Sequence, residues 1–319
     1  MAHATLTNES IVPRAGASPR AAPTLGLPTV DFQGVRIQAA TLTDAMSVVD
    51  QTVLKRERLL IGVVNAAKLV TMREDQALRE AVTKANLILA DGMAVVWACR
   101  LLGRRLPERV TGIDLMDQML LWGQRRHYRI FFLGASDDVL LATLTRIRRQ
   151  FPGVIIAGGR NGFFTSDQEP AVVAAIRAAR PDILLAAMSS PKKELFLARW
   201  FDKLEVPVCH GVGGAFDVFA GKVRRAPKLW QKLGLEWLYR VLQEPRRLWK
   251  RYLVTNTVFA GLVLREMFRG VPAIDSHADA SSESTREQST SPHPARNSVD
   301  VRNSDPRRSQ SEQRELIRK

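Results

Sequence analysis

Short apolar runs alternate with longer segments of mixed character from residue 35 to about residue 210. The short runs are rich in β-branched and aliphatic residues, as are strands that are buried on both faces of a sheet. In the longer segments, apolar residues recur at the spacing of one helix face. The runs that predict strands are residues 35–37, 59–64, 87–90, 130–133, 154–157, 183–187 and 206–209. The segments that predict helices include residues 43–54, 93–102, 114–125, 138–150, 170–179 and 192–203.

Strands that are separated by helical segments form βαβ units, and such units build mainly parallel sheets. We therefore predict an α/β fold with a Rossmann-like, mainly parallel sheet and helices on both faces. Ligands of such sheets bind at the carboxyl ends of the strands. The polar residues that directly follow each apolar run are therefore the first candidates for a site.

After Gly221 the pattern indicates helices alone. One apolar stripe at helical spacing predicts an amphipathic helix, which Pro245 should end or kink. A second helix is expected from Arg246 to about Phe268. The stripe consists of Trp230, Leu233, Trp237, Leu238 and Val241.

Composition divides the chain into four parts. Residues 1–28 are rich in Ala, Pro, Thr and Ser, and residues 271–319 are rich in Ser, Asp and Arg with almost no large apolar side chains. Both compositions are typical of disorder, and we expect no function to depend on residues 275–319. Between these ends we expect a Rossmann-like core at residues 29–221 and a basic, helical, membrane-associating appendage at residues 222–270.

Positive charge is concentrated in the predicted appendage. The formal net charge of the chain is +15, and residues 222–251 hold ten Lys or Arg against two Glu. A local excess of this kind predicts one surface for a polyanionic partner. Tryptophans and tyrosines between the basic residues suit an anionic membrane surface, where each basic residue contributes about 1 kcal/mol. RNA could be bound by the same residue types, but we expect a membrane rather than nucleic acid.

The sequence also bears on the location of the protein. Cys99 and Cys209 lie in apolar surroundings, which indicates reduced thiols in a cytoplasmic chain. The first twenty residues lack the apolar stretch of a secretory signal. The apolar run at residues 253–264 contains Thr and Asn and is too short to span a bilayer. We therefore expect a cytoplasmic protein that lies peripherally on the inner face of the plasma membrane.

Several polar residues follow predicted strands. Asn65 and Asp91 come directly after two of the apolar runs, and Asp217 follows a third after a short loop. Any one of them could simply cap a helix, but several such residues at one sheet edge indicate a site. Asp91 is the best candidate for a general base, because partial burial at a strand end would raise its pKa.

Two further features could bind phosphate groups. Arg109 precedes a candidate helix cap, Thr111, and its guanidinium could bind a diphosphate through two hydrogen bonds; an ordinary surface arginine is the alternative. Gly213 and Gly214 belong to a glycine-rich loop after an apolar run, where backbone N–H groups can approach a phosphate. His210, just before this loop, is expected to be a buried core residue.

Several common site motifs are absent from the sequence. No His or Cys residues have metal-ligand spacing, and no Asp-x-Asp pair occurs. Neither a phosphate-binding P-loop nor the dinucleotide fingerprint is present. We therefore expect no metal and no cofactor. Two alternatives stay open: a basic α/β protein that binds nucleic acid or membrane without catalysis, and a nucleotide-dependent oxidoreductase, which the missing fingerprint disfavours.

Residues 64–115, 131–136 and 211–252 closely resemble the WecG/TagA/CpsF family, glycosyltransferase family 26. The resemblance rests on motifs such as LADG, PERVTGID and GVGGAFDVFAGKVRRAPKLWQKLG, and it covers roughly residues 35–268. It implies an inverting, metal-independent glycosyltransferase with no cofactor. The donor would be a UDP-sugar of the N-acetylmannosamine type or a related hexose or uronic acid. The acceptor would be linked to a polyprenyl diphosphate, in the synthesis of wall teichoic acid, enterobacterial common antigen or exopolysaccharides.

The resemblance also assigns roles to particular residues. Asp91 matches the proposed catalytic base of the family, and Asn65 matches the Asn of its T-x-N motif. Arg109 and Asp217 fall on polar positions of the active site. A C-terminal appendage is thought to close over the active site at the membrane, and its arginines match Arg240, Arg247 and either Lys250 or the neighbouring Arg251.

The chain departs from the family pattern at two positions. Val63 replaces the Thr of T-x-N, and Lys193, in PKKE, replaces the Gln of P-x-Q-E. Val63 removes a hydroxyl from the site. Lys193 adds a cation that could hold a diphosphate or an acidic sugar. Either change could alter the choice of donor, so the donor sugar can differ from that of relatives. The sequence is also compatible with a homo-oligomer.

Overall fold

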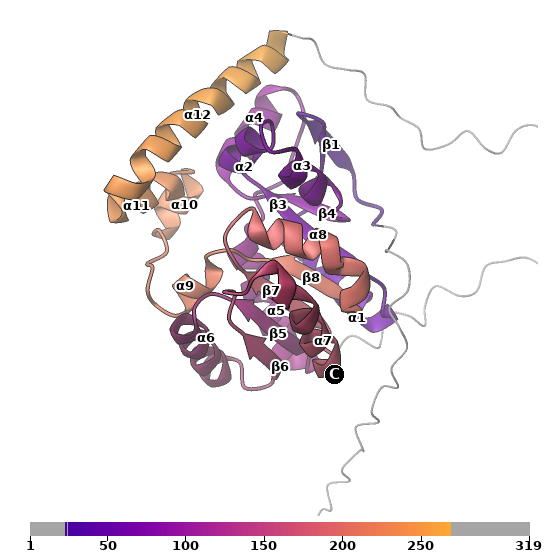
Figure 1. The fold of residues 1–319 in the computed structure, drawn as a ribbon. Helices are drawn as coiled ribbons and strands as arrows, with labels where there is room; N and C mark the ends of the chain where they lie inside the picture. Colours follow the sequence, from indigo (N-terminus) through magenta and orange to yellow (C-terminus); the bar gives the residue numbers. More distant parts are fainter. Residues whose placement is uncertain (1–22, 24, 269–319) are drawn as a thin grey trace, which may run out of the picture. The chain divides into compact units, whose positions relative to one another are not determined.

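The structure is a computed structural model that describes residues 23 and 25–268. Six strands form one parallel sheet in the order β4-β3-β8-β7-β5-β6 (Figure 1). Helices cover both faces of this sheet, so the predicted α/β fold class is confirmed. The strands are β3 (Leu59–Val64), β4 (Leu87–Ala90), β5 (Arg129–Gly134), β6 (Ile155–Arg160), β7 (Ile183–Ala187) and β8 (Val208–Gly211).

Burial on both faces explains why β3, β4 and β7 are apolar throughout, whereas β6 at the sheet edge is only partly buried. In β3, Leu59, Ile61 and Val63 join a core cluster that also contains side chains of α1, α5, α6 and α9. Leu60 and Val64 point to the opposite face, where they pack with helices α7 and α8 or with α2, α3 and α4. The helices are α1 (Leu42–Lys55), α2 (Ala66–Thr71), α3 (Gln76–Thr83), α4 (Met93–Leu101), α5 (Gly112–Arg126), α6 (Asp137–Gln150), α7 (Glu169–Ala179), α8 (Lys192–Leu204) and α9 (Ala215–Phe219).

The first predicted strand lies outside the parallel sheet. β2 (Val35–Gln38) pairs with β1 (Thr29–Phe32) as an antiparallel hairpin. Its turn has Gln33 and Gly34 in the left-handed region, at φ values of 56° and 71°. A two-residue turn with two positive φ values matches the twist of a hairpin. β1 and the short helices α2 and α3 were not predicted from the sequence.

The predicted amphipathic helix at residues 230–241 is interrupted. The structure has α10 (Lys228–Lys232) and α11 (Glu236–Gln243) instead, with Gly234 between them at a φ of 64°. A side chain at Gly234 would come within 2.6 Å of Trp97 on α4, so this glycine permits close packing of the chain against that helix. The second helix is confirmed as α12 (Pro245–Phe268), which begins at Pro245.

The second half of α12 belongs to the core. Phe259, Leu262 and Val263 are buried in the cluster that contains β1, β2 and α4, and the ring of Phe259 lies 5.7 Å from that of Phe32. Arg104 also forms an ion pair with Glu266. The predicted appendage at residues 222–270 is therefore packed against the rest of the chain at its end.

The two segments expected to be disordered, residues 1–28 and 271–319, lie largely outside the described residues. Of the first segment, Leu25 and Leu27 pack against the core, so the packed chain begins slightly before the expected boundary at residue 29. Both cysteines are buried core residues with free thiols, as predicted, and burial raises the pKa of each to about 12.

Candidate active site

The carboxyl ends of β3, β4 and β8 bring the sequence candidates together. Val64 pairs in register with Ala90, and the N–H of Asp91 donates to the carbonyl of Val64 at 2.8 Å. Asn65 and Asp91 therefore leave the sheet side by side. β8 flanks β3 on its other edge and leads into the glycine-rich loop. The three segments form one end of the sheet, where ligands of parallel sheets bind.

Asn65 caps a helix. Its side-chain oxygen accepts a hydrogen bond from the N–H of Lys68 at 2.9 Å, at the start of α2. The simple capping interpretation is thus confirmed for this residue. The cap engages only the oxygen of the amide, and the same side chain packs beside Gly92, next to Asp91.

Asp91 lies among charged groups from three parts of the chain. Burial raises the pKa of this carboxyl group above its ordinary value, and the negative charge of Glu236 raises it further. Lys68, Arg240 and Arg109 act in the opposite direction. A desolvated carboxylate with a raised proton affinity is suited to accept a proton, and the neighbouring cations favour its ionised form.

Lys193 belongs to a buried ion cluster. Its ammonium lies 2.6 Å from the carboxylate of Glu194, and that of Lys68 lies 2.8 Å from the same oxygen. Lys68 also donates to the carbonyl of Val63 at 2.6 Å. Burial and the charge of Lys68 lower the pKa of Lys193. Burial alone would raise the pKa of Glu194, but the two lysines hold it below its ordinary value.

This ion cluster borders Asp91, because the charge of Asp91 raises the pKa of Lys193 and the charge of Lys68 lowers the pKa of Asp91. The ammonium of Lys193 is bound to a neighbouring carboxylate in this structure, so a contact with the donor remains a prediction. Of the positive charges that act on Asp91, that of Lys68 lowers its pKa the most. We infer that Lys68, rather than Lys193, is the lysine of this cluster that favours the ionised form of Asp91.

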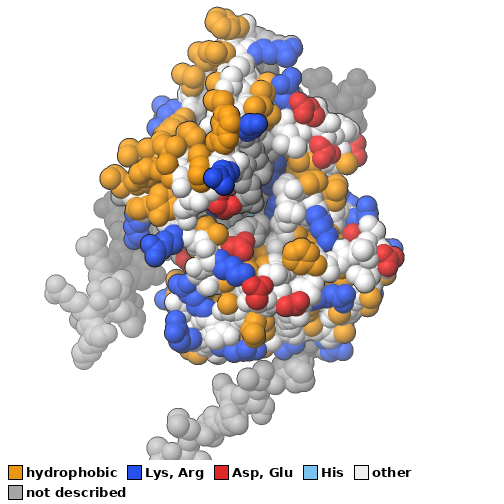
Figure 2. Space-filling model, turned by 60° about the vertical axis from the view of Figure 1, so that its left-hand side comes forward, with side chains coloured by type: hydrophobic (Ala, Val, Ile, Leu, Met, Phe, Trp, Pro, Cys, Tyr) orange, Lys and Arg blue, Asp and Glu red, His pale blue; other side chains and the backbone are white. Residues whose placement is uncertain are grey.

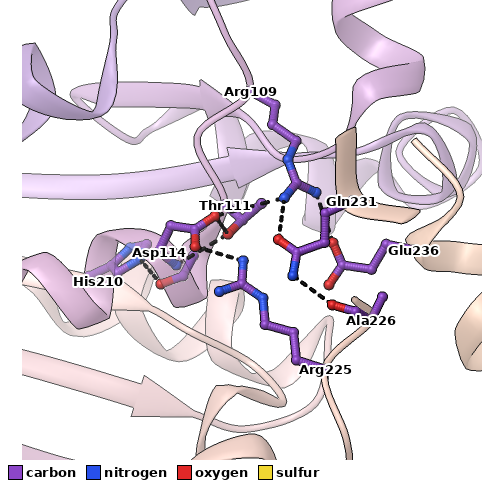
Figure 3. A network of polar contacts seen from close by, with 9 residues as sticks. Arg109, Thr111, Asp114, His210, Arg225, Ala226, Gln231 and Glu236 are labelled. Atoms are coloured by element: carbon purple, nitrogen blue, oxygen red, sulfur yellow. Dashed lines mark hydrogen bonds and ion pairs between the residues drawn. The ribbon is translucent and has the colours of Figure 1, made fainter. Parts of the chain in front are cut away.

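Arg109 lies at the centre of a polar network (Figure 3). Its guanidinium contacts Glu236 at 2.8 Å and Gln231 at 3.0 Å, and it lies 3.9 Å from Asp114. Arg225 binds the other oxygen of Asp114 at 2.6 Å. The side chain of Arg109 is only 13% exposed, which excludes the alternative of an ordinary surface arginine.

The chain beside Arg109 is held at the sheet edge. The N–H of Val110 donates to the carbonyl of Ala90 at 2.8 Å, one residue before Asp91. The predicted cap Thr111 is confirmed, since its hydroxyl accepts from the N–H of Asp114 at the start of α5. The arginine and the candidate base are therefore positioned by neighbouring backbone segments.

The glycine-rich loop packs against the ion cluster. A side chain at Gly211 would meet the Lys193 methylenes at 3.3 Å, and Gly213 adopts a φ of 55° beside the same lysine. Gly214 precedes α9, which carries Asp217. The backbone carbonyl of Asp217 accepts from Lys222 at 2.9 Å, and its side chain is half-buried. These residues lie at the same end of the sheet as Asp91.

The basic residues of the C-terminal helices divide into two groups. Arg240, on α11, is exposed and acts on the pKa of Asp91. Lys250, on α12, is exposed and lies over the ring of Trp249 at 5.6 Å. The side chains of Arg247 and Arg251 lie outside the described part of the structure. Of the four predicted basic residues, Arg240 is therefore the one that the described contacts bring to the site.

His210 is a core residue, as predicted. It is fully buried, with its ring nitrogens 3.5 Å from the carbonyl of Ile61 and 3.4 Å from that of Gly112. Burial lowers its pKa to about 4. The imidazole is therefore neutral in the folded protein at physiological pH.

We expect His210 to make the stability of the protein depend on pH. Between the unfolded pKa near 6.5 and the folded pKa of about 4, the unfolded chain binds a proton that the folded chain excludes. The contribution of His210 to the free energy of unfolding is thus complete above pH 6.5 and should fall by about 2 kcal/mol between pH 7 and pH 5. Urea unfolding of His210→Gln should show a smaller loss over this range than the wild type. The exposed His127→Gln serves as the control, and an equal pH dependence in wild type and His210→Gln would contradict the prediction.

Several residues of this region were not predicted from the sequence. Lys68 and Glu194 had weak signals, since Lys68 stands three residues after Asn65 and Glu194 closes the PKKE motif. Glu236 could have been noticed as an acidic residue within a basic segment. Gln231 and Arg225 have no local signal, because only the tertiary fold brings Gln231 to Arg109 and Arg225 to Asp114.

Residues 23 and 25–268 contain no group of three or more His, Cys, Asp or Glu side chains that could hold a metal ion. Metal independence itself remains a prediction. In the same residues, no helix has the length and apolar character that crossing a bilayer requires.

Comparison with known proteins places the chain among glycosyltransferases. It is 38% identical over 171 residues to N-acetylglucosaminyldiphosphoundecaprenol N-acetyl-beta-D-mannosaminyltransferase of Bacillus spizizenii. That match covers 54% of this chain and 65% of the relative's length. The family model for the Glycosyl transferase WecG/TagA/CpsF family matches residues 30–272. The chain therefore belongs to the WecG/TagA/CpsF family of glycosyl transferases.

Proposed function

We propose that this protein transfers a sugar from a UDP-sugar to an acceptor that is linked to a polyprenyl diphosphate, in the synthesis of a bacterial surface polysaccharide. The sugar is of the N-acetylmannosamine type or a related hexose or uronic acid. Family membership and the name of the Bacillus relative support this class of reaction. The observation that carries the proposal is Asp91, a carboxyl group with a raised pKa at the ligand-binding end of the sheet.

The reaction is a single displacement at the anomeric carbon. An acceptor hydroxyl attacks this carbon from the face opposite the UDP group, so the configuration inverts. The hydroxyl proton passes to the carboxylate of Asp91, and the bond electrons leave with UDP. Asp91 must be ionised to act in this way, and the nearby Lys68 favours the ionised form.

Basic and backbone groups stabilise the departing UDP. Its diphosphate gains negative charge as the glycosidic bond breaks, and fixed donors aimed at that charge lower the barrier. Arg109 and Arg240 both act on Asp91 by charge and therefore lie near the reacting atoms. The N–H groups around Gly213 and Gly214 are further donors. With Asn65 and Asp217 these groups form the proposed substrate site, which needs no metal.

An exposed apolar surface accompanies the basic residues of the C-terminal helices. In the view of Figure 2, hydrophobic side chains gather along one side of the molecule, and Lys and Arg side chains lie beside them. Trp and Leu side chains with interleaved cations favour the headgroup region of an anionic membrane. This surface supports peripheral binding at the inner face of the plasma membrane, where the polyprenyl acceptor lies. Its exposed residues include Leu229, Leu233, Trp237, Leu242, Trp249 and Leu253.

A panel of donors tests the proposed function. The purified full chain is incubated with a short polyprenyl-diphosphate-GlcNAc analogue and one UDP-sugar at a time, in the presence of EDTA. We expect transfer from one UDP-sugar with inverted anomeric configuration, detected by mass spectrometry and NMR. Loss of transfer in EDTA, with recovery on adding a divalent cation, would contradict metal independence, and lack of transfer from every donor would contradict the function.

A further inference from the structure

Arg109 already binds an anion that the protein itself supplies. The carboxylate of Glu236 lies 2.8 Å from one terminal nitrogen of Arg109, and the amide oxygen of Gln231 lies 3.0 Å from the other. Gln231 belongs to α10 and Glu236 to α11, and Figure 3 shows both side chains next to the guanidinium of Arg109. The ion pair is largely buried, with side chains 13% and 18% exposed.

A diphosphate would compete for the same donors. A guanidinium offers two parallel N–H groups, and it binds carboxylate and phosphate oxygens in the same planar geometry. Arg109 also stands beside Asp114 and Arg225, which link it to the start of α5. A ligand diphosphate at Arg109 must therefore replace at least one of the oxygens that the guanidinium binds in this structure.

Glu236 is the partner that can leave most easily. Its negative charge also faces Asp91, where it raises the pKa of that carboxyl group. Moving Glu236 away removes this repulsion between two carboxylates. Gln231 is held on a second side, since its amide donates to the carbonyl of Ala226 at 2.7 Å. Rotation of the Glu236 side chain alone would open Arg109 without breaking that contact.

We propose that Glu236 is an internal stand-in for the donor diphosphate, bound to Arg109 until an anionic ligand displaces it. This inference rests on the proposed function for the identity of the ligand, a nucleoside diphosphate. Glu236 is thus a positioning residue of the donor site. It keeps the guanidinium of Arg109 oriented in the empty enzyme and competes with the donor for it.

Calorimetry of UDP and of inorganic pyrophosphate, with full-length protein, tests the competition. Removing the competing carboxylate in Glu236→Gln should tighten the binding of both anions by about tenfold, because a charged competitor is replaced by a neutral one. In transfer assays the KM for the UDP-sugar should fall by a similar factor, while kcat changes much less. Glu244→Gln removes the same charge from the same segment and should leave the affinity for UDP unchanged.

A double variant separates direct competition from a general effect of charge. In an Arg109→Gln background, Glu236→Gln should no longer tighten binding, since the guanidinium for which Glu236 competes is gone. An undiminished gain in that background, or an equal gain in Glu244→Gln, overturns the inference. Unchanged or weaker binding of UDP and of pyrophosphate by Glu236→Gln also overturns the inference. Transfer by the wild type is measured separately, so failure of the proposed function is distinguishable from failure of this inference.

Discussion

Replacing Asp91 with Asn should reduce the rate of sugar transfer roughly 1,000-fold, because general base catalysis typically contributes factors of this size. The amide keeps the shape of the side chain but cannot accept the acceptor's proton. Binding of UDP should change little, since Asp91 acts on the acceptor hydroxyl. Single-turnover transfer to the polyprenyl-diphosphate-GlcNAc analogue and calorimetry with UDP measure the two effects. Near-normal turnover in Asp91→Asn would exclude this residue as the base.

The stability of the same variant separates a catalytic role from a structural one. Because the pKa of Asp91 is raised in the folded state, the folded protein binds its proton more tightly than the unfolded chain does. The free energy of unfolding therefore falls as the pH rises from the unfolded to the folded pKa of Asp91. The variant with the neutral Asn should be at least as stable as the wild type at pH 7. Asp75→Asn, at the cap of α3, is the matched control and should keep full activity.

The wild-type pH profile follows from the same raised pKa. Asp91 must be deprotonated to act, so kcat should fall as the pH decreases through its pKa. The pH at which kcat falls should lie above the ordinary pKa of an aspartate, which is near 4. A profile that is flat down to pH 4 would contradict the assignment.

The second large effect concerns the membrane. Trp249 and Leu253 lie one turn apart on α12 and are 48% and 60% exposed. Replacing both with Glu removes apolar contact area and adds negative charge at an anionic surface. Binding to vesicles with anionic lipid should weaken roughly 100-fold. Activity on a full-length polyprenyl acceptor in such vesicles should fall in parallel, whereas activity on a short, water-soluble analogue should be retained.

Point substitutions are preferable here to deletion of residues 222–270, because the second half of α12 is part of the core. The double variant Leu54→Glu and Leu141→Glu is the control, since both leucines are exposed and lie on α1 and α6, away from the C-terminal helices in the sequence. That pair should leave vesicle binding intact. If the Trp249 and Leu253 variant binds vesicles as the wild type does, or if the wild type prefers RNA to vesicles at matched salt, the membrane proposal is wrong.

Much of the fold could be predicted because its signals are local. Strands that are buried on both faces consist of apolar runs, and short apolar runs predicted all six strands of the parallel sheet, including the partly buried β6. β2 was predicted as a strand, but its hairpin with β1 was missed, because the residues of β1 alternate between exposed and buried positions and form no apolar run. The break at Gly234 was missed because the apolar stripe continues across it. Close packing against Trp97, rather than periodicity, requires the glycine there.

The candidate site was predictable only in part. Asn65 and Asp91 follow apolar runs, so their place at one sheet edge could be deduced from topology. The partners of Lys193 could not be deduced in this way. The same lysine that appears in the sequence as a cation free to bind a donor forms an ion pair with Glu194, next to Lys68.

The sequence by itself determined the class of sheet, the strand ends that carry Asn65 and Asp91, and the basic aromatic segment. Each of these depends on the order of residue types over a few turns or strands. Only the tertiary structure decided which charges meet. Arg109 and Glu236 are 127 residues apart, and their contact depends on how α11 packs over the end of the sheet. An ion pair between distant segments leaves no periodic pattern in a sequence, because its two members need only be complementary once the fold has brought them together.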